Sequence, residues 1–420
     1  MLSKRMKYMK PSATVELTAK VAQLRRQGVN IIEFNVGEPD FDTPANIAEA
    51  GKAAIDAGFT RYTAVPGVFE LRQAVCDKLK RDNGLEYSPE EVVVSTGAKQ
   101  ALVNALFALV SPGEEVIIPT PCWVSYIDMV TLAGGTPVLA EMDEREAFVL
   151  SVERVAAKLT DRTKVVLINT PNNPTGATYS RESLLALGRL ACERDFYIIS
   201  DEVYEKLIYE GNTHISPASL SQEIKERTVV VNGLSKAFAM TGWRLGYAAA
   251  DKTIARAMNT IQGHVTSATC SIVQKAAIEA LSGPQESVEF MRREFDERRR
   301  WIIDRLRAME GITCAGCTGA FYVMPNVSQL YGRQFEGTVI EDSFGLCHFL
   351  LEQAHIAIVP GAAFEAPDHV RISYSNSLEN IKEGMERMER ALKLLTPAGT
   401  KQDREGRPAK TACQAERSGL

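Results

Sequence analysis

The feature that most constrains the fold of this chain is a regular alternation of short β-branched runs with longer amphipathic stretches. Helical periodicity marks segments such as 99–110 and 181–194. Strands separated by helices favour a mainly parallel sheet with helices on both faces, and functional groups then gather at the carboxyl ends of the strands. The runs predicted as strands are 92–95, 116–118, 165–169, 197–200 and 228–231.

This alternation predicts an α/β fold with a large domain over residues 46–285, built on a mainly parallel mixed sheet. Residues 1–45 and 286–396 are expected to form a smaller α+β domain. Its expected parts are a helix near 14–27, a charged helix at 286–309, the strand-like runs FYVM, IAIV and VRISYS, and a final amphipathic helix.

The last segment, 397–420, differs in composition from the rest. It contains one Leu and no Val, Ile, Phe, Trp or Tyr. So little apolar surface cannot offset the entropy lost on ordering a chain. We therefore predict that this tail is disordered and dispensable.

Composition excludes several classes of protein. A hydrophobic content of 45% and a charged content of 24% are typical of a globular chain. With 48 basic and 53 acidic residues, the net charge of −5 does not favour nucleic acid as a partner. Apolar stretches such as 165–168 are far shorter than the roughly 20 residues of a membrane span. Residues 1–10 are basic but precede no apolar signal segment, so we expect a cytoplasmic protein.

The cysteines and histidines indicate neither a disulfide scaffold nor a metal site. Eight cysteines in 420 residues are too few for such a scaffold. Cys314 and Cys317 form a CxxC pair, which we interpret as structural because no second pair accompanies it. The five histidines show no ligand spacing, so no metal is predicted.

Reactive side chains follow the predicted strands. Lys236 lies soon after the run TVVV, and Asp201 directly follows FYIIS, with Tyr204 three residues later. Asn173 lies in a turn bounded by Pro and Gly after VVLIN. A lysine amine can form a Schiff base with an aldehyde, and a carboxylate can hold a cationic ring nitrogen.

A second group of residues suits an anion. The segment VVVSTGAKQAL is a strand, a glycine turn and a helix start, so the amides of Ala98 and Lys99 are free for an anion. Arg244 adds positive charge eight residues after the lysine, and Trp123 offers a flat aromatic face after another strand. Pyridoxal 5′-phosphate is one ligand that needs all of these groups.

Nine motifs carry a specific resemblance over residues 1–395. The chain resembles a fold-type-I pyridoxal-phosphate aminotransferase of class I. Within that class it is similar to the bacterial aspartate aminotransferases, a subgroup that includes aspartate/prephenate aminotransferases. The motifs are PSATVELTAK, NVGEPDFDTP, TRYTAVPG, TGAKQAL, TPNNPTGA, SDEVYE, SKAFAMTGWRLGY, GAFYV and VRISYS.

The resemblance implies roles for the cofactor-binding residues. Lys236 would form the Schiff base and later act as general base, and Asp201 would pair with the ring nitrogen. Asn173 and Tyr204 would bond the ring hydroxyl, and Trp123 would stack on the ring. The phosphate ligands would be Arg244, the amides of Ala98 and Lys99, and Tyr62 from the partner subunit of a homodimer.

The resemblance also implies substrate contacts. Arg371 would hold the substrate α-carboxylate, with the backbone of Gly37 beside it, and Trp123 and Asn173 would also line the substrate site. Lys99, helped by Thr14, would hold the distal carboxylate of an acidic substrate. One position departs from the pattern: many family members have a phosphate-binding Ser where this chain has Gly233, and Ser235 is a candidate substitute.

The implied reaction is ping-pong transamination between an acidic L-amino acid, with aspartate as the first expectation, and 2-oxoglutarate. The main alternative is that the amino acceptor is prephenate. An aromatic aminotransferase, an alanine aminotransferase and a β-lyase also stay open, because one fold can support different reactions. A non-enzymatic regulator would need an added helix-turn-helix domain, which we do not expect because the aminotransferase pattern begins by residue 11.

Overall fold

The computed structural model describes Met6 and residues 13–397, with the side chains of 13–18 left out. A seven-stranded mixed sheet lies at its centre, in the order β2-β8-β7-β6-β5-β3-β4. Strand β8 pairs antiparallel with both β2 and β7, and all other pairs in this sheet are parallel. The strands are β2 (Val92–Ser95), β3 (Glu115–Thr120), β4 (Thr136–Glu141), β5 (Thr163–Asn169), β6 (Tyr197–Asp201), β7 (Thr228–Gly233) and β8 (Gly246–Ala249).

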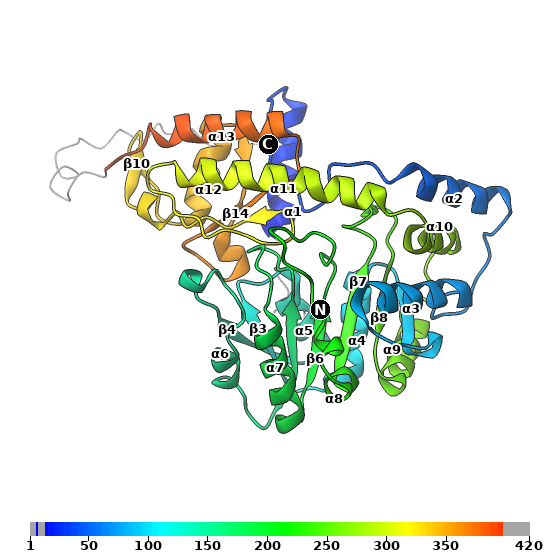
Figure 1. Cartoon of the computed structure of the whole chain (residues 1–420). Coiled ribbons are helices and arrows are strands. Elements are labelled where there is room, and N and C mark those ends of the chain that lie inside the picture. Colours follow the sequence, from blue (N-terminus) through cyan, green and yellow to red (C-terminus); the bar gives the residue numbers. More distant parts are fainter. Residues whose placement is uncertain (1–5, 7–12, 398–420) are drawn as a thin grey trace, which may run out of the picture.

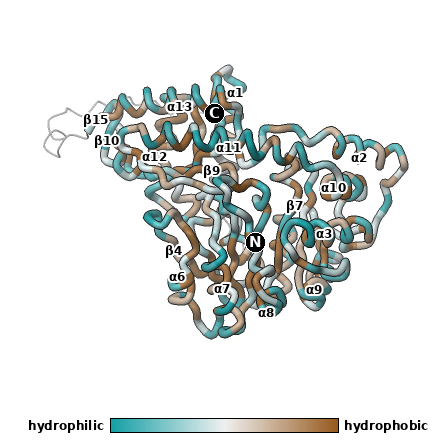
Figure 2. The backbone as a smooth tube through the Cα atoms, in the orientation of Figure 1, coloured by the Kyte–Doolittle hydropathy of each residue, from teal (hydrophilic) through white to brown (hydrophobic). Residues whose placement is uncertain are grey.

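Side-chain alternation explains why helices cover both faces of this sheet. Along β5, Val165 and Leu167 pack with α4, α5 and α9, whereas Val166 and Ile168 pack with α6 and α7. Figure 2 shows the resulting brown interior beneath mixed-colour helices. The helices are α2 (Ala45–Asp56), α3 (Phe69–Asn83), α4 (Ala98–Leu109), α5 (Ser125–Ala133), α6 (Val152–Ala156), α7 (Arg181–Arg194), α8 (Gln222–Glu226), α9 (Lys252–Val265) and α10 (Ser271–Ser282).

The N- and C-terminal segments meet above the carboxyl ends of the strands (Figure 1). Strand β1 (Ile32–Glu33) pairs in parallel with β12 (Ile356–Ala357), so the two ends of the chain share one small layer. The other elements there are α1 (Ala13–Arg26), α11 (Glu286–Arg307), β9 (Tyr322–Val323), β10 (Arg333–Phe335), β11 (Thr338–Val339), α12 (Ser343–Gln353), β13 (Val359–Pro360), β14 (Val370–Ser373), α13 (Leu378–Leu392) and β15 (Thr396–Pro397).

This arrangement supports the predicted division into a large domain over 46–285 and a small one from 1–45 and 286–396, which stays an interpretation. The segment after β6 joins the two parts, because Val203, Tyr204 and Tyr209 belong to the same apolar cluster as α11 and β14. The side chains near the end of β6 are therefore held from both sides.

One assignment at the C-terminal end was wrong. Pro397 was placed in the disordered tail, but it lies in β15 opposite Arg333 of β10. The open edge of β10 offers backbone hydrogen-bonding groups that composition does not reveal. The rest of the tail, 398–420, lies outside the described residues. No helix within 13–397 is both long and apolar enough to cross a bilayer.

Candidate active site

Neighbouring parallel strands bring the predicted reactive residues together. Asn169 at the end of β5 is in register with Asp201 at the end of β6, and Lys236 follows β7. The Lys236 amine donates a hydrogen bond of 2.5 Å to the backbone oxygen of Gly37. Burial lowers the pKa of Lys236 to about 8, although the carboxylate of Glu38 opposes this effect. At pH 7 about one tenth of the amine is therefore neutral, far more than for an ordinary lysine.

Asp201 is a buried carboxylate without a cationic hydrogen-bond partner among the described residues. It accepts a bond of 2.7 Å from the Tyr126 hydroxyl and one of 3.3 Å from the amide of Val203. Burial raises its pKa to about 6, against the opposing effect of the Tyr126 bond. Such a group is stabilised by a cation placed next to it, such as a protonated ring nitrogen.

Tyr126 was missed by the sequence reasoning. It lies in α5, three residues after Trp123, and the two rings meet edge to face at 5.3 Å. The i,i+3 spacing from Trp123 was the available signal, since a helix there would place both rings on one face. Its contact with Asp201 spans 75 positions and cannot be read from a motif.

The structure brings Arg371 and Asn173 together. The Arg371 guanidinium donates to Asn173 Oδ1 at 3.1 Å and to the backbone oxygen of Asn35 at 2.8 Å. Its Nε is buried without a hydrogen-bond partner, and no carboxylate pairs with it in the described part of the chain. A buried, unpaired guanidinium is costly, so this geometry suits an incoming carboxylate.

The start of α4 and Arg244 lie close together and could hold an anion. Gly97 precedes the helix with φ of +85°, and a Cβ there would lie 2.7 Å from the Arg244 guanidinium. The positive φ favours glycine here, and a Cβ would push the guanidinium away from the helix start. The first amides of α4, from Ala98 and Lys99, have no partner within the helix and add positive potential.

The remaining predicted residues have varied positions. The Lys99 amine lies 4.8 Å from the Trp123 ring centre and 3.4 Å from the Ser125 hydroxyl. Tyr62 is 97% exposed. Gly233 is near the anion site, since a Cβ there would lie 3.6 Å from Ala98 Cβ. Ser235 is buried, and the side chain of Thr14 is not described.

The residues present fit pyridoxal phosphate. The helix start with Arg244 suits the phosphate, and the unneutralised Asp201 suits the ring cation. Lys236 suits the aldehyde because its amine is partly neutral, and the orphaned Arg371 Nε suits the carboxylate of the amino acid that reacts there.

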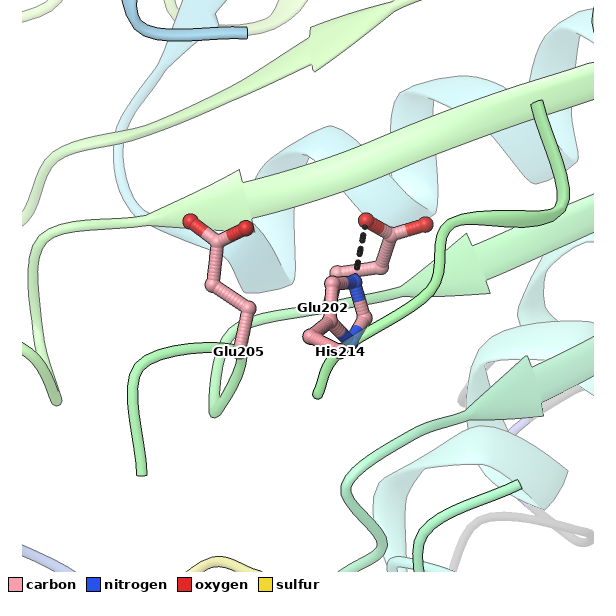
Figure 3. A group of neighbouring side chains, drawn as sticks. All are labelled: Glu202, Glu205 and His214. Carbon is pink, nitrogen blue, oxygen red and sulfur yellow. Dashed lines mark hydrogen bonds and ion pairs between the residues drawn. The ribbon is translucent and has the colours of Figure 1, made fainter. Parts of the chain in front are cut away.

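Glu202, Glu205 and His214 form a separate polar cluster (Figure 3). Atoms of Glu202, Glu205 and His214 lie within 4.8 Å of one another, as metal ligands would. Protein groups already bond these atoms: His214 lies 2.8 Å from Glu202, Ser216 donates to Glu202 at 2.6 Å, and Lys78 pairs with Glu205. Sequence spacing did not reveal this cluster, and the expected absence of a metal stays a prediction.

Fold and site together define an enzyme that handles amino acids with a phosphate-bearing aldehyde cofactor. The profile of the family described as "Aminotransferase class I and II" matches residues 29–388. The chain belongs to this family, and it is a pyridoxal-phosphate-dependent aminotransferase of fold type I.

Similar proteins cover almost the whole chain. The chain is 44% identical to the aspartate aminotransferase of Bacillus sp. (strain YM-2), over 94% of this chain and 99% of that protein. It is 46% identical to the aspartate/prephenate aminotransferase of Cereibacter sphaeroides, over 92% and 98%. A solved aspartate aminotransferase of Thermus thermophilus with maleate superposes with a TM-score of 0.88 at 44% identity, covering 93% and 99%.

Proposed function

We propose that this aminotransferase moves the amino group of an acidic L-amino acid, aspartate first, to 2-oxoglutarate, and that prephenate is a second acceptor. The proposal rests on two cationic side chains among the residues of the candidate site. Arg371 has a buried, unpartnered Nε, and the Lys99 amine stands over the Trp123 ring. Two cations suit a substrate with two carboxylates. The names of the bacterial relatives agree with this choice.

Pyridoxal phosphate, when bound, supplies an aldehyde for the substrate amine and an electron sink for charge at the substrate Cα. Lys236, once free, takes the α-proton because its pKa of about 8 leaves neutral amine available. Asp201 keeps the ring nitrogen protonated, while Tyr204 and Asn173 orient the ring oxygen. Arg371, with the backbone of Gly37, fixes the α-carboxylate and so aims the Cα–H bond at the lysine.

The other proposed contacts hold the cofactor in place. Arg244 and the amides of Ala98 and Lys99 neutralise the phosphate. The ring of Trp123 would stack on the pyridine ring of the cofactor. Because position 233 is glycine, this site lacks the serine hydroxyl that binds the phosphate in many family members. Arg244 and the amides at the start of α4 therefore contribute more to phosphate binding here.

Lys99→Ala is expected to lower kcat/KM for aspartate about 10- to 150-fold more than for alanine or phenylalanine. A charge-assisted bond of about 1.5–3 kcal/mol gives this range. Steady-state kinetics over a panel of donors and acceptors, prephenate included, measures it. Lys52→Ala, at an exposed lysine of α2, is the control. An equal loss of kcat/KM for all substrates would contradict the proposed role of Lys99. A double-mutant cycle with Thr14→Ala tests whether the Thr14 hydroxyl helps Lys99 to hold the distal carboxylate.

We further propose a cytoplasmic homodimer with shared sites, which acts on small molecules and binds neither nucleic acid nor membrane. Tyr62 supports the dimer, because this tyrosine of a family motif is 97% exposed in the described part of a single chain and is available to a second subunit. Sedimentation should show a dimer at assay concentrations, whereas a fully active monomer would contradict it.

Subunit mixing tests the role of Tyr62 directly. Tyr62→Ala and Lys236→Ala homodimers should both be impaired, the first through weaker cofactor binding. In a mixed dimer of the two variants, one site has both native residues, Lys236 from one subunit and Tyr62 from the other. The second site lacks both. The mixed dimer should regain about half of the activity per dimer. No regain would place Tyr62 outside the partner's site.

A further inference from the structure

Tyr322 lies between the proposed cofactor-binding and substrate-binding residues. It is fully buried in β9, and its register partner is Ser373 of β14, two residues from Arg371. Its hydroxyl is 2.9 Å from the Tyr204 hydroxyl. The Arg371 guanidinium lies 4.6 Å from the centre of its ring. One side chain thus contacts both groups.

Gly37 completes the contacts of Tyr322. A Cβ at Gly37 would lie 3.0 Å from the Tyr322 hydroxyl. The same glycine accepts the bond from Lys236 through its backbone oxygen. Tyr322 therefore lies beside three of the proposed site residues: Lys236, Tyr204 and Arg371.

Counting donors shows what the tyrosine pair can do. Each hydroxyl has one proton, and the bond between the two uses one of them. Both side chains are buried, so the remaining proton needs an acceptor outside the pair. If Tyr322 donates to Tyr204, the Tyr204 proton is directed away from Tyr322 and is free for the cofactor ring oxygen.

We propose that Tyr322 is a positioning residue with two separable parts: its hydroxyl directs the Tyr204 proton toward the cofactor ring oxygen, and its ring holds Arg371 for the substrate carboxylate. This inference rests on the placement of the cofactor beside Tyr204 proposed above. The hydroxyl acts on Tyr204 and the ring acts on Arg371. Removing the hydroxyl alone should therefore affect only the first partner, whereas removing hydroxyl and ring should affect both.

The test uses holoenzyme and two readouts other than turnover. The first is the midpoint of the pH titration of the bound cofactor's absorbance, and the second is the Kd of succinate, an unreactive dicarboxylate. Tyr322→Phe should move the midpoint by about 0.4–1 pH unit in the same direction as Tyr204→Phe, as expected for one hydrogen bond. It should leave the succinate Kd within about twofold, since the ring remains. Tyr322→Leu should also raise that Kd, by roughly 2- to 30-fold.

A double-mutant cycle and a control identify the cause. In the Tyr204→Phe background, Tyr322→Phe should cause no further shift of the midpoint. Tyr374→Phe removes another buried hydroxyl, one that bonds the Ala320 backbone oxygen at 3.0 Å, and should move neither readout. An equal shift in both backgrounds, or no shift at all with Tyr322→Phe, would overturn the inference. A Tyr204→Phe protein with an unchanged titration would instead refute the proposed cofactor placement.

Discussion

Lys236→Ala is expected to reduce transamination to less than about one thousandth of the wild-type rate. The substitution removes the amine that holds the cofactor and the base that takes the α-proton, and general base catalysis alone contributes about 10²- to 10⁴-fold. The measurement is kcat with aspartate and 2-oxoglutarate. Borohydride reduction followed by mass spectrometry should also find no cofactor attached to the variant protein.

Lys99→Ala is the matched control for the attachment readout, because it removes a second amine near the same site. That variant should still retain covalently reduced cofactor at Lys236. Wild-type turnover by Lys236→Ala, or cofactor attached to another lysine in the native protein, would refute the assignment of the reactive lysine.

Asp201→Asn is expected to have opposite effects on activity and stability. Activity should fall by about 100-fold or more, because the ring nitrogen loses its anionic partner. The cofactor-free protein, in contrast, should become more stable at pH 7 to 8 by about 2–3 kcal/mol. Burial raises the pKa of Asp201 to about 6, so the wild-type fold carries an unfavourable buried charge at these pH values.

The pH dependence fixes the sign of this second effect. Between about pH 4 and pH 6 the unfolded chain binds fewer protons at this group than the folded chain, so folded stability decreases as pH rises through that window. The advantage of asparagine should therefore vanish below about pH 4. Thermal melting of cofactor-free protein at several pH values measures it, with the exposed Asp195→Asn as control. A less stable Asp201→Asn protein at pH 8 would contradict the buried-charge argument.

The sequence predicted the large sheet and the residues at its strand ends, because local patterns specify them. Lys236, Asp201 and Asn173 follow β-branched runs, and parallel strands bring their ends together without further information. Strands β4 and β8 were not foreseen, since TPVLAE contains a proline and GYAA has no β-branched residue. Only their neighbours in the sheet specify them.

The supporting contacts of the site could not be predicted in the same way. The bonds from Tyr126 to Asp201 and between Tyr204 and Tyr322 join residues 75 and 118 positions apart. The burial of Arg371 depends on contacts with distant residues such as Asn35, Asn173 and Tyr322. Such properties follow from packing in three dimensions, whereas a motif gives only residue type and spacing.

The most direct test of the central claim is a single half-reaction. Holoenzyme is mixed with L-aspartate without an oxo acid, and the cofactor absorbance, oxaloacetate and ammonia are measured together. We predict conversion of the cofactor to its amine form with one oxaloacetate per site and no ammonia, reversed by adding 2-oxoglutarate. Release of ammonia, or no spectral change with aspartate while another amino acid reacts, would contradict the proposed aspartate transamination.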